Sequence, residues 1–124
     1  MQPMCRLALL MTLAALALCG CDWQAKEKIR LVASSVHAGD TEESLIKFSI
    51  SQGWQHEKVA KQKEYGKFST QDYAYFLCIY EKNRRSDFEL QVAFDSTGKI
   101  VPGGINVYYE PTLGEKTLVR FGSR

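Results

Sequence analysis

Histidine is scarce in this sequence, and the short motifs that mark common enzyme classes are missing. The 124 residues include two histidines, His37 and His56, and neither belongs to a group of cysteines and carboxylates at metal-ligand spacing. No G-x-S-x-G, H-E-x-x-H or phosphate-binding glycine loop is present. We therefore expect no metal, no cofactor and no catalytic residue. An enzyme would require folding to bring His37 or His56 against a nucleophile in a pocket.

Neither sign of charge is in large excess. The chain has 16 Lys and Arg against 14 Asp and Glu, a net charge of +2. Arg6 is the only charged residue before Cys21, so 16 − 1 = 15 basic residues remain beside 14 acidic ones. Binding to nucleic acid depends on neutralising many phosphates with a basic surface. We therefore expect no nucleic-acid partner.

The chain begins with one basic residue and a long uncharged stretch. Leu7 to Leu18 reads LALLMTLAALAL, 12 residues without a charge. As a helix they would reach about 18 Å, too short for a hydrocarbon layer of roughly 30 Å. A buried core helix is the alternative, but the stretch lacks the polar face that a surface helix needs. The pattern is typical of a signal peptide.

The end of this stretch, Leu18-Cys19-Gly20-Cys21, resembles the lipobox of bacterial lipoproteins. Leu18, a small residue at Gly20 and the modified cysteine match the motif, whereas Cys19 replaces the commoner Ala or Ser. The resemblance implies a signal peptide over residues 1–20, cleavage between Gly20 and Cys21, and lipid attachment at Cys21 through a diacylglyceryl thioether and an acylated amine, as with palmitate. Two or more acyl chains hold a protein firmly to a membrane.

The implied location is the periplasmic face of a bacterial membrane, to which Cys21 attaches the chain. Asp22 resembles the inner-membrane retention signal of enterobacterial lipoproteins, so the inner and the outer membrane both stay open. Beyond Cys21 the chain has one more cysteine, Cys78, in the apolar run YFLCIY, which is typical of a buried, inert thiol. The alternative is ordinary secretion with a Cys21–Cys78 disulfide.

Two helices are expected near the start of the mature chain. Residues 21–28 are polar and predict a tether, and apolar residues at helical spacing predict a short helix over 29–36. The second predicted helix spans 41–52, where Asp40 and Glu43 have capping-box spacing and Gly53 suits the left-handed position at the end. Glu42 and Glu43 lie where the helix dipole favours negative charge, which explains both without acid–base chemistry.

Beyond this helix the apolar pattern alternates, which predicts strands over 57–65, 73–81, 88–94 and 100–109. Asp95 to Lys99 predicts a hairpin turn, and Pro102-Gly103-Gly104 predicts a bulge in the last strand. Residues 111–124 are expected to be a loosely held tail with room for a short strand at 117–121. The predicted fold is α+β, with one or two N-terminal helices packed on a three- to four-stranded antiparallel sheet in one interaction domain, residues 29–110.

The predicted strand 73–81 is apolar on both faces. Alternation sorts its side chains into two sets, with Tyr73, Tyr75, Leu77 and Ile79 on one side and Ala74, Phe76, Cys78 and Tyr80 on the other. The helix at 41–52 can cover one face, and the other needs the 29–36 segment, the tail or a partner. Since tyrosine and arginine are favoured in interfaces, we predict partner contacts at Tyr75, Arg84 and Tyr108.

Basic side chains gather in two places. Lys58, Lys61, Lys63 and Lys67 follow one another along the chain, and Arg84 and Arg85 lie together in a predicted hairpin turn. The lysines fit a patch for anionic lipid or an acidic partner, or alternatively a solvated strand edge, where lysine discourages unwanted pairing. The arginines fit a partner contact or an exposed turn.

Two stretches resemble the SmpA/OmlA family, the BamE-like small outer-membrane lipoproteins. The stretch from Val36 to Glu43 resembles the family's "G-x-T-x-E" helix entry, and the stretch from Phe94 to Ile100 resembles its "F-D-x-x-G-K-V" hairpin. The resemblance covers about residues 36 to 109. It implies a compact helices-on-sheet fold that binds other envelope components without catalysis, and it carries over no partner-binding residue.

Together these patterns favour a membrane-anchored periplasmic lipoprotein, a non-catalytic protein-interaction or envelope-assembly module with an unidentified envelope protein as partner. The alternative is an immunity or inhibitor lipoprotein that neutralises a toxin or a cell-wall hydrolase. Proteins of that class are also small, lipidated and without catalytic motifs. A toxin gene beside this gene would favour the alternative, and an envelope-assembly operon would favour the first reading.

Replacing Cys21 tests the lipid anchor. Cys21→Ser removes the sulfur on which the thioether forms, so we expect loss of lipidation and of membrane retention. Mass spectrometry of the purified chain and membrane fractionation measure both. A wild-type N-terminus that carries no lipid, or that begins at another residue, would contradict the prediction.

Overall fold

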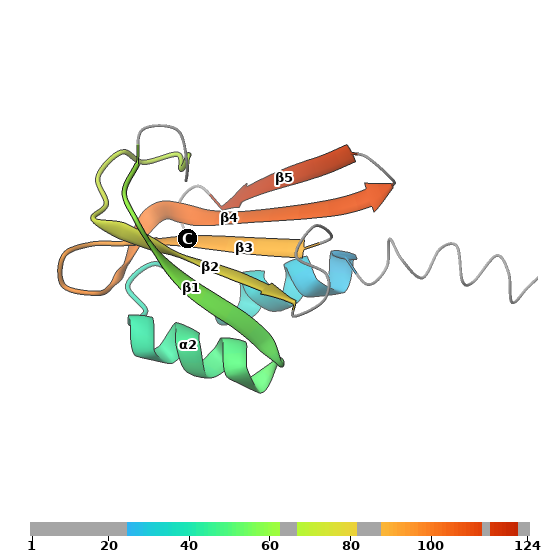
Figure 1. Ribbon diagram of the computed structural model, residues 1–124, viewed down its shortest axis with the longest axis horizontal. Helices are drawn as coiled ribbons and strands as arrows, with labels where there is room; N and C mark the ends of the chain where they lie inside the picture. The colour runs from blue at the N-terminus through green and yellow to red at the C-terminus, as the bar shows by residue number, and fades with distance from the viewer. Residues whose placement is uncertain (1–24, 63–66, 82–87, 113–114, 122–124) are drawn as a thin grey trace, which may run out of the picture.

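The computed structural model describes residues 25–62, 67–81, 88–112 and 115–121, and for residues 111, 112, 115 and 116 it describes the backbone alone (Figure 1). A helix over residues 25–35 leads into α2, Glu42–Ser51. Five strands follow: β1 (Trp54–Ala60), β2 (Tyr75–Glu81), β3 (Phe88–Phe94), β4 (Ile100–Thr112) and β5 (Glu115–Phe121). They form one antiparallel sheet in the order of the chain, β1-β2-β3-β4-β5. The predicted α+β class is confirmed, but the sheet has five strands rather than three to four.

The helix over 25–35 begins inside the segment that was predicted to be a tether. Its Lys28 forms an ion pair with Glu81 at the end of β2, and Arg30 pairs with Glu27 one turn earlier, 2.7 Å apart. Val32 and Val36 are buried, and Ile29 and Leu31 pack partly against the same core. These contacts extend the predicted 29–36 helix toward the N-terminus by one turn.

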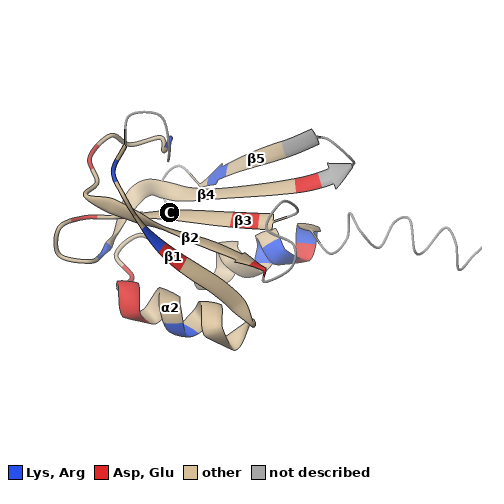
Figure 2. Cartoon of the chain, viewed as in Figure 1, with Lys and Arg blue, Asp and Glu red and all other residues tan. Residues whose placement is uncertain are grey.

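The second helix, predicted over 41–52, is one residue shorter at each end and has a different N-cap. Thr41 has an extended backbone, and its hydroxyl accepts a hydrogen bond from the Ser44 amide at 3.2 Å. Asp40 instead accepts a bond from the His37 amide, 2.9 Å away, in the preceding turn. Glu42 and Glu43 occupy the first turn as predicted. In Figure 2 the start of α2 is therefore red, the colour of Asp and Glu.

The end of α2 and the start of β1 form a tight turn. Gly53 has a φ of 74°, the left-handed conformation expected of it. Trp54 then packs edge-on against Phe48 of α2, with ring centroids 5.6 Å apart, and β1 begins at once. The strand predicted at 57–65 therefore lies earlier, because pairing with β2 starts at Trp54 opposite Glu81.

The strand β4 contains the predicted bulge and is longer than predicted. Its pairing with β3 shifts between Val92 and Phe94, whose partners are Ile105 and Ile100. Within the bulge, a Cβ on Gly104 would lie 2.9 Å from the Val101 carbonyl oxygen, so only glycine fits there. The short strand allowed at 117–121 is present and begins two residues earlier, as β5, which pairs with β4 from Ile105 opposite Phe121. Residues 111 and 112, expected in a loosely held tail, instead complete β4.

Both helices pack on the same face of the sheet. Val32 and Leu45 from the helices, and Val36 just after the first helix, join one buried apolar cluster with alternate residues of the strands. The strand residues include Leu77, Ile79, Phe88, Leu90, Val92, Phe94, Ile105 and Val107. We call this side the helix face and the opposite side the second face. A separate, smaller cluster lies on the second face and includes Phe76, Cys78 and Ala93.

The two ends of the sheet are defined by where the helix over 25–35 begins and where it ends. The helix over 25–35 begins beside Glu81 and Phe88, whose ring lies 5.4 Å from the Lys28 ammonium. It ends at the opposite end, where the Gly39 amide donates to the Ile100 carbonyl at 2.7 Å. We call the first the proximal end and the second the distal end (Figure 1).

Tyr75 links the start of α2 to the distal end of the helix face through a hydrogen bond and ring contacts. Its hydroxyl donates to the Glu42 carboxylate at 2.9 Å, and its ring stacks on Phe94 with centroids 5.3 Å apart. The Lys58 ammonium lies 4.1 Å from the centre of the Tyr75 ring and 3.8 Å from the Glu42 carboxylate. Burial, with the hydrogen bond to Glu42 as a smaller cause, raises the pKa of Tyr75 to about 12.

Stability at alkaline pH tests the Tyr75 contact. Because the pKa of Tyr75 is raised from 10.0 to about 12, its contribution to stability is complete below pH 10.0 and is lost as the pH rises toward 12. Tyr75→Phe should lower the free energy of unfolding by about 1 kcal/mol below that window and make its decline within the window shallower. Urea denaturation followed by circular dichroism measures both. Equal declines in the two proteins would contradict the prediction.

Candidate functional site

Three rows of side chains cross the second face in register. The first row, at the proximal end, contains Gln55, Tyr80, Glu89, Tyr108 and Leu118. The middle row contains Glu57, Cys78, Gln91, Asn106 and Arg120, and the third, toward the distal end, Val59, Phe76 and Ala93. The second face therefore changes from apolar to polar and aromatic along the strands.

The third row is covered by the loop that precedes β2. Phe68 is buried and packs edge-on against Phe76 and Tyr73, with centroids 5.6 Å and 5.1 Å away. The Ser69 hydroxyl donates to the Gly103 carbonyl at 2.8 Å, which ties the loop to the bulge in β4. Tyr73 was expected beside Tyr75, but it lies before β2 begins and packs on the second face.

The first row forms a half-buried aromatic strip. Tyr80, Tyr108 and Leu118 are each partly exposed, and Glu89 between the two tyrosines is buried. Burial raises the pKa of Tyr108, while Arg120 on β5 opposes the change. Neither described helix lies on this strip, because both pack on the helix face. A tyrosine ring offers apolar area and a hydroxyl that tolerates water, which suits a surface that alternates between solvent and a partner.

The middle row holds buried polar groups where an alternating strand pattern predicts exposure. Gln91 and Asn106 are 3% and 0% exposed, and Glu89 in the neighbouring row is 8% exposed. The Gln91 side-chain amide donates to the Glu89 carboxylate at 2.9 Å. A polar residue between apolar ones in a strand usually faces water, so the sequence pattern does not mark Gln91 or Asn106 as buried. Cys78 is fully buried beside them, as predicted.

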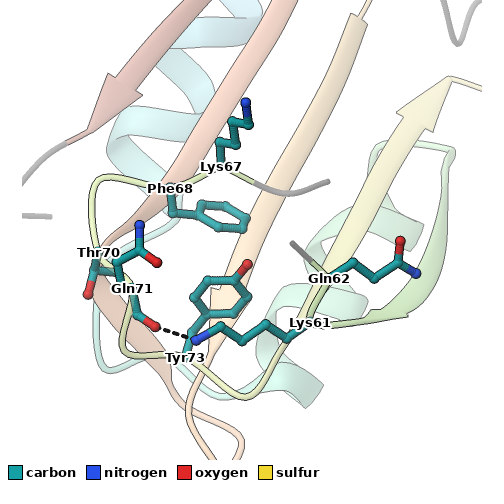
Figure 3. A pocket seen from close by; sticks show the side chains of 7 residues that line it. All are labelled: Lys61, Gln62, Lys67, Phe68, Thr70, Gln71 and Tyr73. Carbon is teal, nitrogen blue, oxygen red and sulfur yellow. Dashed lines mark hydrogen bonds between the residues drawn. The ribbon is translucent and has the colours of Figure 1, made fainter. Parts of the chain in front are cut away.

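A pocket of about 420 Å³ lies at the distal end, lined by Lys61, Gln62, Lys67, Phe68, Thr70, Gln71 and Tyr73 (Figure 3). The Lys61 ammonium donates to the Gln71 carbonyl and lies 4.6 Å from the centre of the Tyr73 ring. The Lys67 ammonium points away from both rings (Figure 3). The two lysines do not converge on one point, so the pocket does not concentrate positive charge as an anion site requires.

The predicted contact residues are distributed over different surfaces. Tyr75 lies on the helix face and Tyr108 on the second face, so one flat partner surface does not reach both. Lys58 contacts Tyr75 on the helix face, apart from Lys61 and the distal pocket. Several predicted positions lie outside the described residues: Arg84, Arg85, Lys63, Cys21 and the predicted signal peptide.

The two histidines are exposed and lie in different elements. His37 lies in the turn before α2, and His56 lies in the edge strand β1. Within residues 25–62, 67–81, 88–112 and 115–121, no group of three or more histidines, cysteines or carboxylates could hold a metal ion.

Comparison with known proteins assigns no function to this chain, so the geometry is the basis for proposing one. No family model, no curated protein and no solved structure matches this chain. Among the described helices, none is both long enough and apolar enough to cross a membrane.

The burial of Cys78 predicts a structural role for its thiol. Cys78→Ala should lower the free energy of unfolding by on the order of 1 kcal/mol, because it truncates a fully buried side chain in the small second-face cluster. Denaturant titration measures the change, and a thiol reagent should label the folded wild type far more slowly than the unfolded chain. Rapid labelling of the folded protein would show that the thiol is exposed.

Proposed function

We propose that this chain is a non-catalytic interaction module of the bacterial envelope, anchored by lipid on Cys21 at the periplasmic face of a membrane. The anchor follows from the lipobox resemblance at Leu18 to Cys21. The interaction role follows from the second face, whose aromatic first row offers a contact surface. A protein partner would pack across Tyr80, Tyr108 and Leu118.

The observation that carries this proposal is the placement of both helices on the same face of the sheet. Val32, Val36 and Leu45 all join the helix-face core, and the described part of the loop with Phe68 contacts the third and middle rows of the second face. Tyr80 and Tyr108 therefore keep exposed surface at the proximal end of the sheet. Aromatic side chains of this kind dominate the energetics of many protein interfaces.

The chain's geometry favours a partner close to the membrane surface. From Cys21 to the first described helical residue there are 25 − 21 = 4 residue steps, which span at most about 14 Å. The first row lies at the proximal end, beside the start of that helix. The distal pocket lies roughly 20 Å farther along the strands, at 3.3 Å per residue. A partner on the first row would thus contact the module near its anchor, which suits an envelope protein that is itself associated with the membrane.

Alanine substitutions in the first row test the proposal. Tyr108→Ala and Tyr80→Ala should each reduce the protein partner recovered with the lipidated chain from membranes by about tenfold, a loss typical of an aromatic interface residue. Quantitative mass spectrometry of the recovered complex measures this, and circular dichroism checks that each variant is folded.

Ile50→Ala is the matched control, because Ile50 is 62% exposed on α2, away from the second face. It should leave recovery of the partner unchanged. If both tyrosine variants recover the partner at wild-type amounts while His37→Ala or His56→Ala abolishes function, the interaction role is wrong and an active site is indicated.

A further inference from the structure

Two buried amide side chains occupy paired positions in the middle row of the second face. Gln91 on β3 pairs in register with Asn106 on β4. The Gln91 amide nitrogen donates to the Glu89 carboxylate at 2.9 Å, and the Asn106 amide nitrogen donates to the Lys67 carbonyl at 2.8 Å. The two amide oxygens, Gln91 Oε1 and Asn106 Oδ1, are buried and accept no hydrogen bond.

The orientation of both amides is set by their neighbours. Rotating either amide by half a turn would place its oxygen against a carboxylate or carbonyl oxygen and lose the existing bond. The two oxygens are therefore acceptors without donors, on paired residues whose Cβ atoms lie about 5 Å apart. Buried acceptors of this kind are rare in folded proteins and costly to leave unpaired.

The surroundings select a donor with positive charge. Glu89 lies on the same face two residues before Gln91, and its carboxylate is largely buried. Arg120 lies in the middle row opposite Asn106, but it is exposed, and neither orphaned oxygen accepts a bond from it. Glu57 adds a second carboxylate at the β1 end of the row. A cation with several N–H groups would satisfy both oxygens beside the Glu89 charge.

We propose that Gln91 and Asn106, with Glu89 beside them, bind an arginine side chain of the protein partner. This inference rests on the proposed function and names the partner chemistry that the same face recognises. A guanidinium group has five donors in one plane, so it can meet two amide oxygens and a carboxylate together. Both oxygens lie beneath the surface of the isolated chain, and the long apolar stem of arginine suits a side chain that must reach inward.

Binding of a short arginine peptide tests the site directly. The chain is purified in detergent, and the side-chain amide signals of Gln91 and Asn106 are followed by NMR as an acetylated Gly-Arg-Gly amide peptide is added. Both signals should shift and saturate, whereas the peptide with norleucine in place of arginine should leave them unchanged. Absence of a shift with the arginine peptide, or equal shifts with both peptides, overturns the proposal.

Variants locate the binding within the second face. Gln91→Met keeps the length of the side chain and removes its acceptor, so affinity for the arginine peptide should fall about tenfold, as expected for a lost hydrogen bond to a charged group. Gln52→Met makes the same change at an exposed position at the end of α2, away from the second face, and should not alter affinity. An equal loss in both variants overturns the proposal. So does a shift of the Gln91 and Asn106 signals in Arg120→Gln without peptide, because Arg120 would then be the donor.

Recovery of the protein partner separates this inference from the proposed function. If Tyr108→Ala loses the partner and Gln91→Met retains it, the interaction role stands and the arginine site is wrong. If both variants lose the partner and Gln52→Met retains it, the arginine site is supported. If neither Tyr108→Ala nor Gln91→Met reduces recovery, the proposed function fails together with the inference.

Discussion

The central strand β3 imposes the main constraint on this fold, because it is buried along its whole length on two faces of opposite chemistry. Phe88, Leu90, Val92 and Phe94 point to the helix face, and Glu89 and Gln91 point to the second face. Successive side chains of a strand must point to opposite sides, so no single cover can serve both sets. The two helices pack on the apolar set and leave the polar set to be satisfied in another way.

The position of the helices depends on a few contacts at the distal end. The Glu42 amide donates to the Gly98 carbonyl at 2.9 Å, and the Ile100 amide donates to the Asp40 carbonyl at 2.9 Å. Tyr75 adds its hydrogen bond to Glu42 from β2. These bonds hold the start of α2 against the β3–β4 turn. At the other end of the helix, the Trp54 ring packs against Phe48 and Phe88. Both ends of α2 are thus held, which keeps the helix layer on one side of the sheet.

The loop before β2 covers one part of the second face, and another part keeps exposed side chains. The loop with Phe68 and Ser69 encloses the apolar third row, and Asn106 reaches that loop through the Lys67 carbonyl. The first row keeps partly exposed tyrosines, and the buried amides lie between the two parts. Polar groups in such a place cost stability unless they are paired, so the two unpaired amide oxygens are the least favourable feature of this face.

The sequence by itself determined the elements whose signals are local: α2 with its acidic first turn and Gly53, the strand β3, and the bulge in β4. It did not determine the start of β1, and it allowed the fifth strand only as a shorter possibility, because both depend on pairing with other strands of the sheet. Nor did it separate Tyr75 from Tyr108, or show that Gln91 is buried. Whether a strand residue faces a helix, a loop or solvent depends on which element packs against that face, and only the tertiary structure decides this.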